Sequence, residues 1–177
     1  MSLITLKNVK KEYGKNQVLF ENLSLEIEKG EFVGLVGKSG AGKTTLLNII
    51  GLITDISEGI ITIDGHQNLS MNSKNAMILR RYTIGYLFQN YGLIEDESVL
   101  WNLKLALEYK KIKREEKLKL INKYLKQFEL NDMLNKKVYQ LSGGEQQRIA
   151  IIKLILQGSQ IILADEPTSG LDKENEL

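Results

Sequence analysis

The sequence predicts an α/β fold that carries a helical insertion. Alternating apolar and polar residues across positions 3–36 are typical of strands. A glycine-rich turn at 37–44 separates an apolar run from an apolar helix, and helical periodicity dominates from about residue 98 to 156. Because residues 160–164 form one more apolar strand, we expect an α/β core with an antiparallel β part and a helical insertion.

The individual elements follow in chain order from the same patterns. The apolar run 32–36 is expected to be a short strand that leads into the glycine-rich turn, and residues 44–53 are expected to form a buried helix. Further strands are predicted at 59–65 and 83–88, with a polar helix-prone segment between them. We expect a single domain over residues 1–177, with a helical subdomain at about 90–145.

Composition excludes several classes of protein. With 42% hydrophobic and 26% charged residues the chain has the balance of an ordinary globular domain, and its formal net charge of +2 is far from that of a dedicated nucleic-acid binder. The absence of cysteine excludes disulfides and cysteine-based metal sites. No stretch reaches the roughly 18 apolar residues of a membrane span, and the N-terminus does not resemble a secretory signal.

Residues 37–44, GKSGAGKT, match the phosphate-binding pattern G-x-x-x-x-G-K-[ST]. Glycine lets the backbone wrap closely enough for several N–H groups to converge on a phosphate, and the helix that follows directs its positive end toward the same point. Lys43 would supply a cation to the β- and γ-phosphates, and the Thr44 hydroxyl would ligate Mg²⁺. The motif therefore predicts ATP as the cofactor.

The strand at 160–164 ends in two adjacent acids, Asp165 and Glu166. Side chains at the carboxyl end of a strand in a parallel sheet face the ligand crevice. Asp165 is the candidate for the Mg²⁺ shell and Glu166 for the base that polarises the attacking water. An ordinary solvated turn is the alternative interpretation of the two acids taken alone.

Residues 141–148, LSGGEQQR, resemble the signature motif of the ABC family of ATP-binding proteins. The serine and two glycines precede a strong helical pattern, which predicts a second anion-binding helix N-terminus. The resemblance covers about residues 3–172 and implies that Ser142, Gly143 and Gly144 close over the nucleotide held by the opposite subunit of a head-to-tail dimer.

Other residues receive a role from this resemblance alone. It implies that Gln89 contacts Mg²⁺ or the attacking water, that Tyr13 stacks on adenine, and that Asp172 in the segment SGLD contributes across the dimer. The nucleotide-binding residues that it implies in the phosphate loop are Gly37, Ser39, Gly40, Ala41, Gly42, Lys43, Thr44 and Thr45.

The flanks of Gln89, at 80–85 and 88–94, are most similar to the macrolide-exporter and lipoprotein-release branch, and within it to bacteriocin or peptide exporters. The resemblance implies a transport ATPase on the inner face of the cell membrane, bound to a membrane-spanning permease, with no nucleic-acid partner. Trp101, Leu103, Leu105 and Leu107 lie where the family meets that permease, although core packing is the commoner reason for such apolar spacing.

The family also places a histidine on a loop about thirty residues after the acidic pair, whereas this sequence ends at Leu177 and its single histidine, His66, is expected in an exposed turn. We therefore expect the C-terminal part of the family domain to be missing. A fragment, a domain completed by a partner and a decayed paralogue are all compatible with this. An ATP-binding module without turnover and a non-transport ABC ATPase are the alternative functions. The charge run at 110–117 is interpreted as a solvated helix start, with contact to membrane or nucleic acid as the alternative.

Overall fold

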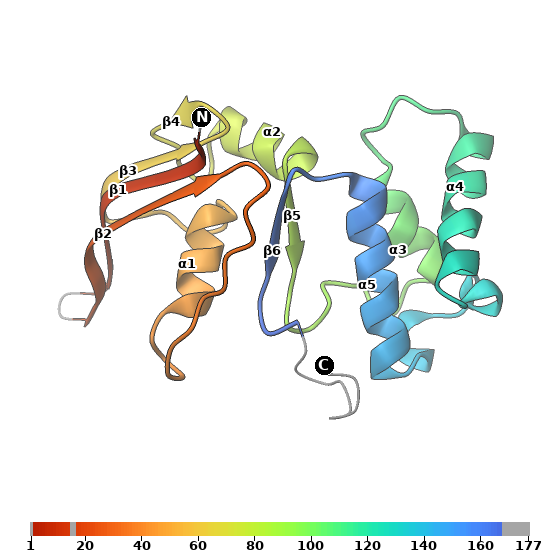
Figure 1. Cartoon of the computed structure of the whole chain (residues 1–177). Helices are drawn as coiled ribbons and strands as arrows, with labels where there is room; N and C mark the ends of the chain where they lie inside the picture. Colours follow the sequence, from red (N-terminus) through yellow and green to blue (C-terminus); the bar gives the residue numbers. More distant parts are fainter. Residues whose placement is uncertain (1, 15–16, 168–177) are drawn as a thin grey trace. The chain divides into compact units, whose positions relative to one another are not determined.

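The computed structural model describes residues 2–14 and 17–167 (Figure 1). The chain divides into two compact units, Met1–Arg80 and Arg81–Leu177. Each unit has its own sheet and its own helices. No helix within the described residues is both long and apolar enough to cross a membrane.

The first unit is built on a four-stranded sheet in the order β2-β1-β3-β4, with antiparallel pairing throughout. The strands are β1 (Ser2–Tyr13), β2 (Gln17–Glu28), β3 (Glu58–Ile63) and β4 (His66–Gln67). In β1 and β3 the buried positions alternate, with Ile4 and Leu6 on one strand and Ile61 and Ile63 on the other. This period of two places one apolar face toward the core, as the sequence pattern predicts.

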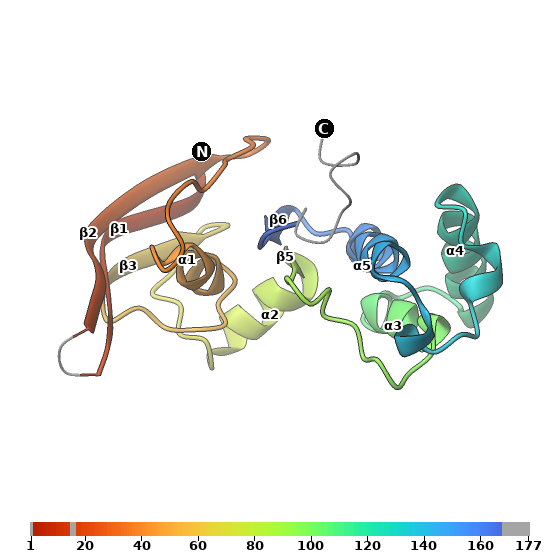
Figure 2. The ribbon, with the colours of Figure 1, turned by 90° about the horizontal axis from the view of Figure 1, so that it is seen from below.

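Two helices complete the first unit, α1 (Lys43–Ile50) and α2 (Lys74–Tyr82). Helix α1 lies beside the sheet in both views (Figures 1 and 2) and buries Ile49 and Ile50 near its C-terminal end. These helices confirm the expected helix after the glycine-rich turn and the helix-prone segment before residue 83. His66 is exposed as expected, but it lies in β4 and pairs with Ile63 rather than in a turn.

The predicted strand at 32–36 is wrong. Within the described residues this segment has no regular structure and pairs with no strand, and Phe32 and Val36 are 100% and 98% exposed. An apolar run becomes a strand only when a neighbouring strand supplies hydrogen-bond partners for its backbone. Among the described residues nothing supplies them here, so the local pattern alone was insufficient.

Up to residue 167, the second unit combines a small parallel sheet with three helices and two short 3₁₀ turns. Strand β5 (Ile84–Leu87) pairs in parallel with β6 (Ile161–Ala164). The helical elements are α3 (Val99–Ala106), α4 (Arg114–Gln127), η1 (Asn131–Met133), η2 (Val138–Gln140) and α5 (Gly143–Gln157). Helix α5 lies between the two strands and the helices α3 and α4 in both views, which agrees with its contacts to β5, α3 and α4 (Figures 1 and 2).

The core of the second unit forms where α3, α4 and α5 meet. Its fully buried side chains include Leu103 and Leu107 from the α3 region, Ile121 from α4 and Ile149 from α5. Trp101 and Leu105 remain 40% and 41% exposed. Of the four apolar residues expected to contact either a partner or the core, Leu103 and Leu107 therefore lie in the core and Trp101 and Leu105 are exposed to solvent.

Helices α4 and α5 begin and end where local chemistry predicts. The charge run at 110–117 contains the start of α4, where Arg114, Glu115 and Glu116 are exposed, as expected for a solvated helix start. Helix α5 ends at Gly158, whose φ of 70° is a left-handed conformation that glycine adopts without strain.

Candidate nucleotide-binding and catalytic sites

The phosphate loop lies in the first unit and leads into α1. Gly40 and Gly42 adopt φ angles of 79° and 90°, in the region that favours glycine. A Cβ atom on Gly42 would lie 2.9 Å from side-chain atoms of Leu19, so a larger residue here would force Leu19 to move. Ser39, Gly40 and Ala41 are exposed, and the Ala41 N–H donates to the Lys38 carbonyl at 3.2 Å.

The N-terminus of α1 is suited to an anion. Gly42 is the N-cap and supplies no side-chain hydrogen bond, and no acidic residue lies in the first turn. The first N–H groups of a helix have no partner within the helix and carry its positive end. An oligophosphate therefore fits this end of α1 both in hydrogen bonding and in charge.

Lys43 and the two threonines that follow occupy the first turn of α1. The Lys43 Nζ donates to the carbonyls of Gly37 and Lys38 at 2.8 and 3.0 Å, so the side chain folds back over the loop. Thr44 is exposed and Thr45 is half-buried. The ammonium thus lies over the phosphate loop, and its role toward a phosphate stays a prediction.

Tyr13 belongs to the same unit as the phosphate loop. It ends β1, pairs with Gln17 of β2 and is 45% exposed. Leu19, two residues further along β2, is the residue that faces Gly42. The sheet therefore holds the candidate adenine platform on a strand pair that also contacts the phosphate loop.

Gln89, Asp165 and Glu166 gather at the carboxyl ends of β5 and β6 in the second unit. The Gln89 Nε2 donates to the Glu166 Oε2 at 2.9 Å, and the backbone N–H of Asp165 donates to the Leu87 carbonyl at 3.1 Å. Glu166 has a φ of 47°, an uncommon conformation for a residue with a side chain. Burial, with a smaller contribution from the Asp165 carboxylate, raises the pKa of the Tyr86 phenol to about 12.

The signature segment forms the N-terminus of α5 and is closed by a capping box. The Ser142 Oγ accepts from the Glu145 N–H at 3.3 Å, while the Glu145 Oε2 accepts from the Ser142 N–H at 2.7 Å and from its hydroxyl at 2.9 Å. These hydrogen bonds hold the pKa of the Glu145 carboxyl below its usual value. The predicted helix start is confirmed, and the Glu145 carboxylate accepts the hydrogen bonds that the Ser142 N–H and hydroxyl donate.

A tight turn after Gln89 connects the acidic pair to the signature helix. Tyr91 and Gly92 both have positive φ angles, and the Lys153 Nζ of α5 donates to the Gly92 carbonyl at 2.7 Å. Burial lowers the pKa of the Lys153 ammonium. A Cβ atom on Gly143 would lie 3.7 Å from the Tyr91 hydroxyl, which places the tyrosine beside the signature glycines. Sequence reasoning missed Lys153, since a lysine inside a helix gives no local signal.

The structure thus brings together the predicted residues within each unit. Tyr13 and the phosphate loop share the first unit, and Gln89, Asp165, Glu166 and the signature segment share the second. Asp172 lies outside the described residues. Within those residues, His, Cys, Asp and Glu side chains nowhere gather in threes. Hydroxyl, amide and single carboxylate oxygens suit an Mg²⁺ that takes its other ligands from phosphates and water.

Comparison with known proteins identifies the family. The ABC transporter family model matches residues 20–169. The macrolide export ATP-binding/permease protein MacB of Campylobacter jejuni is 42% identical over 173 residues, which are 98% of this chain but only 27% of the relative. The phosphonates import ATP-binding protein PhnC of Lactobacillus acidophilus is 40% identical, over 99% of this chain and 71% of that protein.

A solved structure agrees with the fold. A dimeric post-hydrolysis state of the ATP-binding cassette MJ0796, bound to ADP and Pi, superposes with a TM-score of 0.86 at 39% identity, over 97% of this chain and 77% of that chain. The match confirms the expected α/β cassette with an antiparallel sheet and helices. The chain therefore belongs to the ABC transporter family, as an ATP-binding domain.

Proposed function

We propose that this chain binds Mg·ATP and hydrolyses it to ADP and phosphate, and that hydrolysis drives a membrane-spanning permease. The observation that carries the proposal is the cluster of Gln89, Asp165 and Glu166 at the ends of two parallel strands. The first unit supplies a second supporting observation, the N-terminus of α1, which has no side-chain cap and no acidic residue in its first turn.

The phosphate loop holds the triphosphate. Backbone N–H groups from 37–45 bind the phosphate oxygens, and the Lys43 ammonium exchanges its loop carbonyls for the β- and γ-phosphates. Thr44, Gln89 and Asp165 would hold Mg²⁺, which neutralises charge on the transferring group when bound. Tyr13 stacks on the adenine.

Glu166 acts as the general base. A carboxylate beside the γ-phosphate can orient a water for in-line attack and take its proton. The Gln89 amide donates to one Glu166 oxygen, which leaves the second oxygen for water. Gln89 thereby orients the base as well as contacting the metal.

A second copy of the domain completes the nucleotide site. Ser142, Gly143 and Gly144 of one copy close over the ATP of the other, and Asp172 contributes at the same interface. A dimer of the related cassette MJ0796 supports this arrangement. Because the Glu145 carboxylate already accepts from Ser142, closure requires the phosphate to compete with it or to use the neighbouring glycine N–H groups.

An exporter of a peptide, bacteriocin or lipophilic substrate is the favoured transport role, with the domain on the inner face of the cell membrane. The similarity to MacB, named for macrolide export, supports this direction. Import is the alternative, because a phosphonate importer's ATP-binding protein is nearly as similar.

The exposed side chains of Trp101 and Leu105 on α3 form the proposed contact with the permease. Residues at i and i+4 lie on one face of a helix, and this face is apolar yet exposed to solvent. Leu103 and Leu107 are fully buried and serve the core instead.

Phosphate release by a Glu166→Gln variant tests the catalytic role. Glutamine keeps the shape of the side chain but cannot accept the water proton, so we expect Mg·ATP affinity within about twofold of the parent and turnover reduced by at least ~100-fold. Glu115→Gln, an exposed carboxylate on α4, is the matched control. Retained turnover in Glu166→Gln would remove this residue from the role of base, and ATP binding without turnover in the parent chain would favour the non-hydrolysing module.

Co-purification with a co-expressed permease tests the proposed partner surface. We expect Trp101→Ala to leave ATP binding unchanged and to weaken co-purification several-fold, since aromatic anchors dominate interfaces. Tyr139→Ala removes an aromatic side chain elsewhere in the same unit, 55% exposed against 40% for Trp101, and should have no effect. Equal recovery of permease by both variants would exclude Trp101 from the interface.

A further inference from the structure

Lys11 on β1 is a buried cation that sequence reasoning did not single out. Only 8% of the residue is exposed. Burial of an ammonium is costly unless it is hydrogen-bonded or paired. Its Nζ donates to the Asp55 carbonyl at 2.8 Å and to the Thr54 Oγ1 at 3.3 Å, and it lies 4.7 Å from the centre of the Tyr13 ring.

The ring contact constrains the candidate adenine platform. A cation over an aromatic face is attracted by the ring's electron density, and the contact holds the ring in place. Because the ammonium occupies one face of Tyr13, only the opposite face is available for a nucleobase. Tyr13 is 45% exposed, which leaves room for such stacking.

The hydrogen bonds of Lys11 connect this platform to the helix that carries the phosphate loop. The N–H groups of Ile53 and Thr54 both donate to the Asn48 carbonyl of α1, so the segment that binds Lys11 is joined to the end of that helix. The other end of α1 begins at the phosphate loop. Lys11 therefore links Tyr13 to the element that would hold the phosphates of the same nucleotide.

We infer that Lys11 is a positioning residue for nucleobase binding, which ties the Tyr13 ring to Thr54 and Asp55 and leaves one face of the ring for the base. The inference rests on the proposed adenine stacking by Tyr13. Lys11 has no assigned contact with the phosphates, so its effect should be limited to the base. Because stacking on a ring does not distinguish one base from another, Lys11 is not expected to select adenine over other bases.

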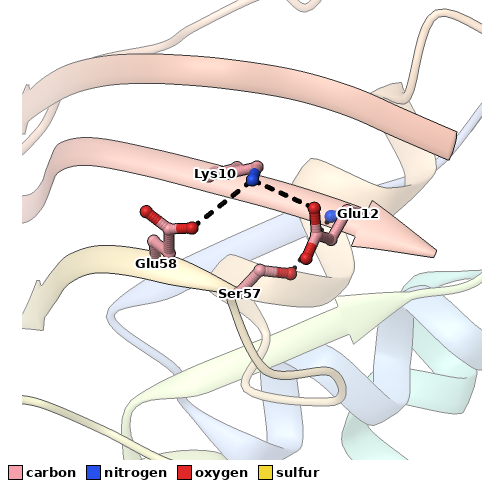
Figure 3. A network of polar contacts seen from close by, with 4 residues as sticks. All are labelled: Lys10, Glu12, Ser57 and Glu58. Carbon is pink, nitrogen blue, oxygen red and sulfur yellow. Dashed lines mark hydrogen bonds and ion pairs between the residues drawn. The ribbon is translucent and has the colours of Figure 1, made fainter. Parts of the chain in front are cut away.

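The neighbouring Lys10 provides a matched control on the same strand. Its Nζ pairs with Glu12 at 3.0 Å and with Glu58 at 3.4 Å, and the Glu12 N–H donates to the Ser57 hydroxyl (Figure 3). Lys10 thus carries the same charge next to Lys11 but is engaged by carboxylates instead of an aromatic ring.

The test compares binding of Mg·ATP with binding of Mg·tripolyphosphate, which lacks the base. For Lys11→Met we expect ATP affinity to fall about fivefold to tenfold, the range that loss of a partly buried cation–π contact produces, while tripolyphosphate affinity stays unchanged. Lys11→Arg should recover most of the ATP affinity. Lys10→Met should bind both ligands as the parent does.

Loss of affinity for both ligands in equal proportion would overturn the inference, because it would assign Lys11 a purely structural role. If Lys11→Met fails to fold, Lys11→Gln replaces it, since an amide still donates to the Asp55 carbonyl but carries no charge; the same ATP-specific loss is expected. Tyr13→Ala separates the two proposals. An ATP-specific loss in Tyr13→Ala without one in the Lys11 variants contradicts the role of Lys11, and no such loss in Tyr13→Ala contradicts adenine stacking itself.

Discussion

The phosphate loop and the signature segment both place glycines at the start of a helix, yet one helix N-terminus has no side-chain cap and the other has one. Helix α1 begins at Gly42 without a side-chain cap and without an acidic residue in its first turn. Helix α5 begins at Ser142, with a capping box closed by Glu145. Similar glycine-containing sequences thus produce an uncapped N-terminus in α1 and, in α5, an N-terminus that is capped with the help of the Glu145 carboxylate.

The difference indicates different tasks for the two glycine motifs. At the uncapped end of α1, the hydrogen bonds that a phosphate would have to replace are the two from Lys43 to loop carbonyls and the one from the Ala41 N–H to the Lys38 carbonyl. The capped end is stable by itself, because the capping box already satisfies its first donors. We infer that a single copy binds nucleotide through α1 and that the signature segment contributes only when the two copies close.

The largest expected difference between the two motifs is the change in unfolding free energy caused by a glycine-to-alanine substitution. Gly42→Ala would force a side chain into a φ of 90° and into contact with Leu19, so we expect a loss of roughly 1–3 kcal/mol of unfolding free energy and loss of ATP binding. Gly144→Ala meets no atom within 4 Å in α5 and should be neutral or stabilise by up to about 1 kcal/mol. Urea unfolding measures both, and equal costs would contradict the comparison.

Removal of the α5 cap should have a smaller effect. Glu145→Ala deletes the acceptor for the Ser142 N–H and hydroxyl, so we expect a loss of about 1 kcal/mol of unfolding free energy. Glu115→Ala removes a first-turn carboxylate of α4 that lies outside the capping box of that helix, and it should change stability little. If both variants unfold at the same urea concentration as the parent, the capping box contributes nothing to α5.

Acidification should reveal the smallest effect. The pKa of Glu145 is lowered in the folded state, chiefly by its hydrogen bonds to Ser142, so the unfolded chain binds the proton more readily. The contribution of Glu145 is therefore complete above its unfolded pKa of 4.5 and is lost as pH falls through the lower folded value. Glu145→Gln retains a capping acceptor that does not titrate. Between about pH 5 and pH 3, the range where free carboxyls titrate, the unfolding free energy of this variant should therefore fall less than that of the parent.

The sequence predicted those features that local chemistry determines. Apolar periodicity located the helices α1 and α5 and the strands β1, β3 and β5, because burial of one face imposes the period. The motif residues Gln89 and Glu166 were identified from the chain, but their contact across 77 positions became visible only in the fold. The domain boundaries and the contribution of a second copy stay predictions.

Features that depend on tertiary partners escaped sequence reasoning. Residues 32–36 have the composition of a strand but lack a pairing neighbour among the described residues. Lys11 and Lys153 look like ordinary surface lysines in the sequence. Only the fold buries Lys11 against a tyrosine and half-buries Lys153 at the Gly92 carbonyl. Local composition does not report which distant carbonyl or ring a side chain will meet.

Mg·ATP binding and phosphate release, measured on one preparation of the 177-residue chain and of its Lys43→Ala variant, test the central claim most directly. We predict that the parent binds ATP and releases phosphate and that Lys43→Ala does neither, since it loses the cation assigned to the β- and γ-phosphates. Binding or turnover that survives in Lys43→Ala would contradict the assignment of the nucleotide site to the phosphate loop.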